Sequence, residues 1–428
     1  MVKKIIVVFT TLFITIGSFA QKNNTSAYSF FGIGDVNSSN TVEQLSMGGI
    51  GVSLDDSFHL NLSNPASNSS LSFTTYAIGL ENKNIRANDG TDKQKAAATY
   101  LSYLALGIPL GEKGGLTFGL LPNSSVGYSL TSNTYSSSDE LEEITFYNGE
   151  GGTNKVFLGF GFEVFKGFSV GLQGNYLFGK IDNSVVNQIK DVTLATKYQT
   201  IANVKSFSLN TGFQYKKELK NKLNLHFGGN FNLESEIKSN GNEYLYSVSL
   251  GSYETPKDTI LSTESEGVMK YPLKSSLGVG VGKENKWYAG IDYSYQKAIE
   301  LSGSVFSNYS KIKYDDSNKL SLGGYYIPKY NSITSYWNRV TYRAGVKLEK
   351  TGLLVDGLGS GNDFTAIDDF GISFGIGLPV SNQLSNLNLG FEFGKRGEVS
   401  NGLVKENYVN FRLSLSLNDK WFRKLEIF

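Results

Sequence analysis

From Leu71 onward the chain alternates between apolar and polar residues. The alternation is clearest near the end, where one set of alternate positions is apolar and the other polar: Val409, Phe411, Leu413, Leu415 and Leu417 against Asn410, Arg412, Ser414 and Ser416. Successive side chains of a β-strand point to opposite faces of its sheet, so a period of two predicts strands with one apolar face. The pattern therefore predicts an all-β chain.

Fourteen segments carry this pattern, and we predict a strand in each. Their approximate bounds are Leu71–Glu81, Ala98–Leu110, Gly115–Tyr128, Thr153–Val164, Phe168–Gly179, Ala202–Tyr215, Leu223–Glu234, Tyr271–Gly282, Trp287–Gln296, Lys319–Tyr326, Arg339–Glu349, Phe370–Pro379, Leu387–Lys395 and Tyr408–Leu417. A soluble β-sandwich shows the same period, so alternation alone does not decide whether the apolar face meets lipid or a protein core.

The connections between the predicted strands alternate in length, and this decides the environment. The short ones include 111–114 and 165–167, the stretch 327–338 fits loosely, and the long ones are 82–97, 129–152, 180–201, 235–270, 297–318, 350–369 and 396–407. Transmembrane barrels have short periplasmic turns, long outer loops and an even number of strands. Lipid cannot satisfy an open sheet edge. We therefore predict a closed, antiparallel, 14-stranded transmembrane β-barrel over 71–417, surrounded by a lipid bilayer.

The first twenty residues have the pattern of a secretory signal peptide. Two lysines precede the apolar run Ile5–Ile16, and Ser18-Phe19-Ala20 provides a small-x-small cleavage site. The apolar run is shorter than the roughly 20 residues that a spanning helix needs. We expect cleavage after Ala20, residence in the cell outer membrane, an N-terminal segment at 21–70 and a periplasmic tail at 418–428.

Composition excludes several classes of function. The 40 Lys and Arg residues balance 39 Asp and Glu residues, whereas nucleic-acid binding requires a basic surplus. The chain has no cysteine and only two histidines, His59 and His226, which leaves little material for a metal site. His226 has no acidic neighbour in the sequence, so hydrolytic chemistry has no support. We predict a protein that is not an enzyme and carries no cofactor or metal.

The stretch from Tyr28 to Ala66 is rich in glycine and follows neither a strand nor a helix period. It contains Tyr28-Ser29-Phe30-Phe31-Gly32-Ile33-Gly34-Asp35, then Gly48-Gly49-Ile50-Gly51 and Asn64-Pro65-Ala66, just before the first predicted strand. This order resembles a divergent branch of the FadL-type long-chain fatty acid transporter family. The resemblance implies that 21–70 is a plug inside the barrel, with Gly48, Gly49, Asn64, Pro65 and Ala66 as its motif residues.

The resemblance also implies a route for hydrophobic ligands from outside into the barrel wall, and then sideways into the membrane through a kink in the third strand. That strand here carries Pro122 and Asn123 between Leu121 and Ser124. Proline cannot donate to a ladder, so it independently indicates a bulge or a broken pair. The alternative is a strand that ends near Leu121 and continues as a loop.

Candidate ligand contacts follow from these expectations. Phe30, Phe31 and Met47 would line an apolar path past the plug. Arg343 and Arg412 lie on the polar faces of their strands, where a guanidinium could bind the carboxylate of an amphiphile. The alternative is that such charges pair with one another or with the plug carboxylates Asp35, Asp55 and Asp56.

Two functions remain open. The first is transport of hydrophobic small molecules of the fatty-acid-like class. The second is a FadL-like structural or shuttle subunit of an outer-membrane protein-export translocon of the type IX kind, with a large partner protein. The polar character of 235–270 keeps the second open, because a lipid-capture site is expected to be apolar.

Overall fold

The computed structural model describes residues 26–251, 254–303, 305, 312–357, 359, 361–380 and 385–419. The expected signal peptide and all but the first two residues of the expected periplasmic tail lie outside these ranges. Among the described residues, no helix has the length and apolar character needed to cross a membrane.

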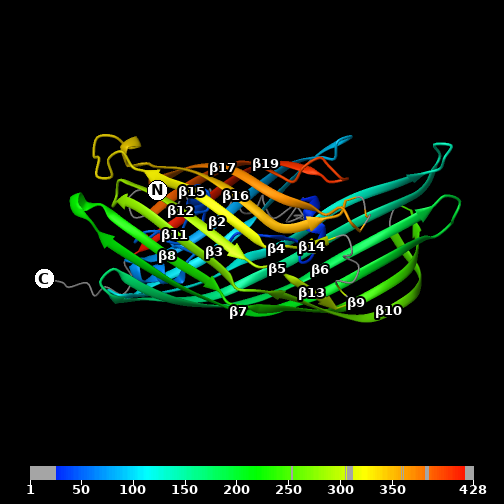
Figure 1. The fold of residues 1–428 in the computed structure, drawn as a ribbon, viewed down its shortest axis with the longest axis horizontal. Helices are drawn as coiled ribbons and strands as arrows, with labels where there is room; N and C mark the ends of the chain where they lie inside the picture. The colour runs from blue at the N-terminus through cyan, green and yellow to red at the C-terminus, as the bar shows by residue number, and fades with distance from the viewer. Residues whose placement is uncertain are drawn as a thin grey trace, which may run out of the picture.

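The wall is a closed antiparallel barrel of fourteen strands, as predicted (Figure 1). Ten wall strands are single elements: β2 Thr74–Asn88, β3 Lys93–Leu110, β4 Gly114–Tyr135, β5 Leu141–Phe165, β6 Phe168–Ile189, β7 Ala195–Glu218, β16 Thr341–Val355, β17 Thr365–Val380, β18 Ser385–Arg396 and β19 Lys405–Asp419. The last strand pairs with the first, from Asp419 opposite Thr74 to Lys405 opposite Asn88, and this closes the cylinder.

Four further wall strands each consist of two elements. They are β8 Asn224–Asn232 with β9 Ser235–Leu250, β10 Glu254–Tyr271 with β11 Lys274–Lys283, β12 Trp287–Gln296 with β13 Glu300–Gly303, and β14 Ile312–Tyr314 with β15 Ser317–Tyr326. Together with a register shift in β16 between Lys350 and Leu354, these breaks affect five consecutive wall strands. We call this line of interruptions the crease.

The predicted connection 396–407 is largely a loop, with strand only at its ends, but the predicted connections 82–97, 129–152, 180–201 and 235–270 are wrong as loops. Most of their residues belong to strands, and the turns that remain are short: 89–92, 136–140 and 190–194. Hairpins β4–β5, β6–β7 and β9–β10 project together at one end of the barrel (Figure 1). Sequence alternation missed these extensions because both faces of the projecting strands are largely polar, as in β10. The asymmetry between the two ends is nevertheless real, and we refer to the long-hairpin end and the short-turn end.

An apolar band surrounds the half of the barrel next to the short turns. On β5 the exposed side chains Val156, Leu158, Phe160, Phe162 and Val164 succeed one another at alternate positions. With a rise of about 3.3 Å per residue and a tilt of about 40°, they span roughly 20 Å along the barrel axis. This is close to the apolar band of about 25 Å in transmembrane barrels.

The N-terminal segment lies within the wall. It contains η1 Ala27–Phe30, β1 Asp35–Val36, α2 Val42–Leu45 and η2 Pro65–Ser70; two more short helices, η3 Lys220–Lys222 and η5 Trp337–Arg339, belong to turns at the short-turn end. Hydrogen bonds join the segment to strands around the whole circumference, among them β4, β7, β12, β17 and β18. Most of its residues from Thr41 to Ser69 are buried.

Candidate functional site

Asn64, Pro65 and Ala66 fix the N-terminal segment to one side of the barrel. The Asn64 amide nitrogen donates to the carbonyl oxygens of Val52 at 2.7 Å, Phe213 at 3.0 Å and Gly229 at 3.3 Å. Its side-chain oxygen accepts from the Ala66 N–H at 3.0 Å and so caps η2, where Pro65 occupies a favourable first position. One side chain therefore joins two parts of the segment to two wall strands.

Wall glycines allow the backbone of the segment to approach this closely. A Cβ at Gly171 of β6 would lie 2.3 Å from both the Ala66 nitrogen and the Pro65 carbonyl carbon. At the opposite wall it is a glycine of the segment that allows the approach: Gly48 has a φ of +72°, and a Cβ there would lie 2.6 Å from the Val346 oxygen of β16. Its N–H donates to Ser373 Oγ at 2.8 Å. Both predicted motifs therefore lie where the segment meets the wall.

A cavity of about 640 Å³ opens toward the long-hairpin end. We call it the outer apolar cavity, and its apolar lining includes Phe30, Phe31, Tyr128, Tyr147, Ile181 and Val204. Phe30 packs edge to face against Phe31 and Tyr128, with ring centroids 5.1 Å and 5.0 Å apart. Such a lining suits an apolar ligand.

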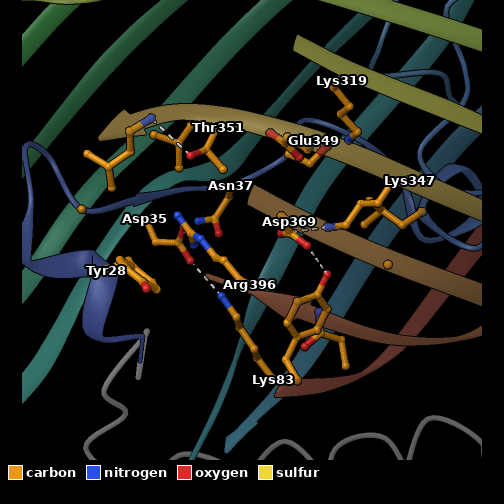
Figure 2. Close-up of a pocket in the computed structure, with 18 of the residues that line it drawn as sticks. Tyr28, Asp35, Asn37, Lys83, Lys319, Lys347, Glu349, Thr351, Asp369 and Arg396 are labelled. Carbon is orange, nitrogen blue, oxygen red and sulfur yellow. Dashed lines mark hydrogen bonds and ion pairs between the residues drawn. The ribbon is translucent and has the colours of Figure 1, made fainter. Parts of the chain in front are cut away.

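A second cavity of about 320 Å³, the charged cavity, shares Tyr28, Phe31 and Ile33 with the first. Asp35 of β1 accepts from Lys83 at 2.8 Å and from Arg396 at 2.6 Å (Figure 2). Burial alone would raise the pKa of Asp35, but the guanidinium of Arg396 and the ammonium of Lys83 outweigh it and hold the pKa well below its usual range. Asp35 is therefore ionised and ties the N-terminal segment to β2 and β18.

The ladder between β3 and β4 is interrupted beside this cavity. Pairing runs from Leu110 opposite Gly114 to Leu104 opposite Leu120 and stops there. Within the described ranges, residues 93–103 of β3 pair only with β2, whereas β4 continues beside β5 to Tyr135. Tyr100, Ser102 and Pro122 at the interruption also line the charged cavity.

Strand β1 takes the place that β3 leaves. Asp35 lies opposite Ser125 and Val36 opposite Ser124, so this edge of β4 is paired with the N-terminal segment. The β4–β5 register shifts between Pro122 and Ser124, where the sequence predicted an irregular ladder. The alternative, a strand that ends near Leu121, is wrong because β4 continues for a further fourteen residues to Tyr135.

The predicted ligand contacts separate into two groups. Phe30 and Phe31 both line the outer apolar cavity. Met47 lines neither that cavity nor the charged one; it is 1% exposed and packs with Ile50, Leu54 and Tyr288. The expected single apolar path past all three residues is therefore absent from the described part of the chain.

The two candidate arginines have protein partners. Arg412 lines the charged cavity, where it forms ion pairs with Glu81 at 3.0 Å and Glu392 at 2.5 Å. Arg343 lies in another cavity near the short-turn end and donates to Asn388 at 3.0 Å. The alternative of mutual pairing therefore describes Arg412, and a role for either residue in ligand binding stays a prediction.

The plug carboxylates also pair, though not with those arginines. Asp55 lies 3.0 Å from Lys216, and Asp56 lies 2.9 Å from the Nδ1 atom of His59. Burial lowers the pKa of His59, but the Asp56 carboxylate more than offsets this, so the net shift is upward.

Sequence reasoning missed two buried acids that hold the segment in place. Glu43 of α2 accepts from Asn388 at 2.7 Å and Ser416 at 3.1 Å. Asp292 of β12 accepts from the N–H groups of Gly51 and Val52 at 2.7 and 2.9 Å. An acid on the inward face of a strand is a signal for such a contact, but its partner lies hundreds of residues away.

Comparison with known proteins places this geometry among FadL-type barrels. The family model described as BamG matches residues 1–427. No curated protein matches. Three solved structures are the Pseudomonas putida toluene transporter TodX (TM-score 0.59, 14% identity, 91% of this chain and 100% of that one), the Ralstonia pickettii toluene transporter TbuX (0.58, 12%, 89% and 98%) and a Pseudomonas aeruginosa FadL homologue (0.56, 12%, 89% and 98%). They confirm the predicted fold.

Proposed function

This chain belongs to the BamG family, and we propose that it is an outer-membrane barrel that passes a hydrophobic small molecule from the long-hairpin end sideways into the lipid. The observation that carries the proposal is the continuity of its spaces. The outer apolar cavity meets the charged cavity at Phe31 and Ile33, and the charged cavity meets the β3–β4 interruption at Tyr100 and Pro122.

In this proposal the N-terminal segment acts as the plug, and β1 acts as the gate. An apolar ligand enters the outer apolar cavity against Phe30 and Phe31. It then displaces β1 from β4, which leaves the edge of β4 beside the unpaired edge of β3. The ion pairs of Asp35 oppose this step, because releasing β1 separates its carboxylate from Lys83 and Arg396.

The structure constrains the chemical class of the ligand less than it constrains the route. TodX and TbuX are described as toluene transporters, which supports small hydrocarbons. The fatty-acid-like class rests on the sequence resemblance. The wall has a polar and charged inner cavity rather than an apolar tunnel, so a compact ligand fits the route better than a long chain.

A disulfide across the gate tests the mechanism. The chain has no cysteine of its own, and Val36 and Ser124 are direct register partners, which places their Cβ atoms about 5 Å apart. We expect oxidised V36C/S124C to reduce uptake of radiolabelled toluene by on the order of tenfold or more, and reduction to restore it. The control N82C/T99C joins another register pair, between β2 and β3, and should leave uptake unchanged. Normal uptake through the oxidised gate variant would refute lateral release past β1.

A block at the outer cavity tests the entry site separately. Thr200 and Thr196 lie on the same face of β7, but only Thr200 lines the outer apolar cavity. Thr200→Trp should therefore reduce ligand binding, whereas Thr196→Trp should not. Equal binding by both variants would place the ligand elsewhere.

A structural or shuttle role in a larger outer-membrane assembly is the second candidate. It is favoured by the charged lining of the inner cavity, in which Lys347, Glu392 and Arg412 are joined by ion pairs of 2.9 Å and 2.5 Å. Native mass spectrometry of protein extracted gently from its own outer membrane separates the two roles. A monomer with hydrophobic adducts supports transport, and co-migration with a much larger protein, without adducts, supports the subunit.

A further inference from the structure

A further internal space lies behind the crease and plays no part in the proposed route. It has a volume of about 290 Å³ and is enclosed by the N-terminal segment on one side and β5 to β15 on the other. Its lining is dominated by asparagine, serine, glutamine and lysine. We call it the polar chamber. It adjoins the charged cavity, with which it shares Lys274, Gln296 and Lys319.

Three lysines supply the chamber with positive charge that the acid of its own lining does not balance. They are Lys155, Lys274 and Lys319, and among the described residues none of them forms an ion pair. Lys155 donates to Ser39 Oγ at 2.7 Å. Within the described ranges Asp292 is the only acid of the lining, so these residues carry a formal surplus of two positive charges when all four groups are ionised.

In the neighbouring charged cavity, most cations form ion pairs with buried acids. There Lys83 and Arg396 pair with Asp35, Lys347 pairs with Glu392, and Arg412 pairs with Glu81 and Glu392. The two lysines that the cavities share, Lys274 and Lys319, form no ion pair among the described residues; Glu349, the register partner of Lys319, lines the charged cavity and balances one of their two charges. Even with Glu349 counted, three lysines face two acids, and desolvating a cation is costly unless a negative group compensates it, so the chamber favours an anion.

Buried side-chain oxygens without hydrogen-bond partners place a second requirement on the ligand of the chamber. The side-chain oxygens of Asn210 and Asn230 and the Oδ1 atom of Asp292 are buried without a hydrogen-bond partner among the described residues. All three residues line the chamber. Asp292 cannot donate when ionised, and its other oxygen is already held by Gly51 and Val52. A ligand that satisfies this wall must donate hydrogen bonds as well as carry negative charge.

We propose that the polar chamber binds a small hydrophilic oxyanion that also carries a hydroxyl group, such as hydrogen phosphate, a phosphate monoester or a hydroxycarboxylate. The three ammonium groups bind the charged oxygens. The hydroxyl group donates to the acceptors on Asn210, Asn230 or Asp292. At about 30 Å³ per water, the chamber holds such an anion together with part of its hydration shell.

Hydrogen phosphate and sulfate make a matched pair for the test, because both are tetrahedral dianions near neutral pH and only hydrogen phosphate has a hydroxyl. The full-length barrel in lipid nanodiscs is titrated with each by calorimetry, and phosphate binding is followed independently by the ³¹P linewidth, with sulfate as competitor. We expect phosphate to bind at least tenfold more tightly than sulfate, as a hydrogen bond between charged groups implies. Gluconate then separates hydroxycarboxylates from phosphates.

Variants locate the site. Lys274→Gln and Lys319→Gln should each weaken phosphate binding by on the order of tenfold or more. The control Lys270→Gln alters an exposed lysine on the same wall strand that does not line the chamber, and it should bind phosphate normally. Asn230→Ala should narrow the preference for phosphate over sulfate.

Three results would overturn the proposal. They are binding of neither anion by the wild-type barrel, equal affinity for the two anions, and phosphate binding that survives both lysine substitutions. The wild-type measurements need no variant, so misfolding of a variant cannot hide the first two. The proposal does not rest on transport: loss of toluene uptake in the gate variant leaves phosphate affinity unaffected.

Discussion

Replacing Asn64 with alanine should release the N-terminal segment locally without opening the wall. The substitution removes the cap of η2, which is worth about 1 kcal/mol. It also removes the donor to the carbonyl oxygens of Val52 and Phe213, at 2.7 and 3.0 Å, for which we allow about 1 kcal/mol each. The local free energy of opening should therefore fall by about 3 kcal/mol.

Hydrogen exchange measures this free energy directly. A loss of about 3 kcal/mol corresponds to roughly a 100-fold increase in the population of the open segment. We expect the amides of η2 to exchange faster by about this factor in Asn64→Ala, while amides in the β5–β6 ladder keep their wild-type rates. Asn84→Ala is the control, because its exposed side chain lies on β2 away from the segment. An increase of less than about threefold would show that Asn64 does not anchor the segment.

Three further outcomes follow from the contacts of the segment and wall. The contacts of His59 raise its pKa, so the ion pair between His59 and Asp56 stabilises the fold fully below about pH 6.5 and loses this contribution as the pH rises through the raised pKa. A ¹H NMR titration of His59 should give a pKa above 6.5, and a value below 6.5 would contradict the pairing. Arg412→Met leaves Glu81 without its ion-pair partner and Glu392 with Lys347 alone, and should cost about 3–5 kcal/mol in urea unfolding followed by heat modifiability, whereas an unchanged midpoint would mean that water compensates Glu81. Gly171→Ala should displace the segment, because its Cβ would meet backbone at 2.3 Å, whereas Gly174→Ala, with its nearest contact at 3.6 Å, should be tolerated; equal proteolysis of both variants would refute the close approach.

The wall was predictable because lipid and lumen impose opposite chemistry on alternate side chains. Phe411 and Arg412 show this directly, since one faces outward and the other reaches an internal ion pair. The projecting hairpins were not predictable in the same way. Residues 235–270 have solvent on one face and polar neighbours on the other, so their strands carry no period-two signal, although their ladder is long.

The motif residues at the contact between the N-terminal segment and the wall were predictable, but the pairings of the charged residues were not. Gly48, Gly49 and the Asn64-Pro65-Ala66 motif indicated a backbone that approaches the wall closely and adopts conformations that favour glycine. The partner of Asp35 could not be inferred, because Lys83 and Arg396 come from strands that meet only when the barrel closes. The pairing between β1 and β4 was missed for another reason: a two-residue strand has no periodicity.

The crease divides five neighbouring strands of the wall into two tiers whose geometries need not match. Below it, the hydrogen-bond register of every strand is fixed by the requirement that alternate side chains meet lipid. Above it, the interruptions in five neighbouring strands take up any mismatch, so residues can be inserted or removed in hairpin β9–β10 without shifting β8 or β11 against their neighbours. The outer parts of these five strands can therefore change in length without altering the register of the parts that meet lipid.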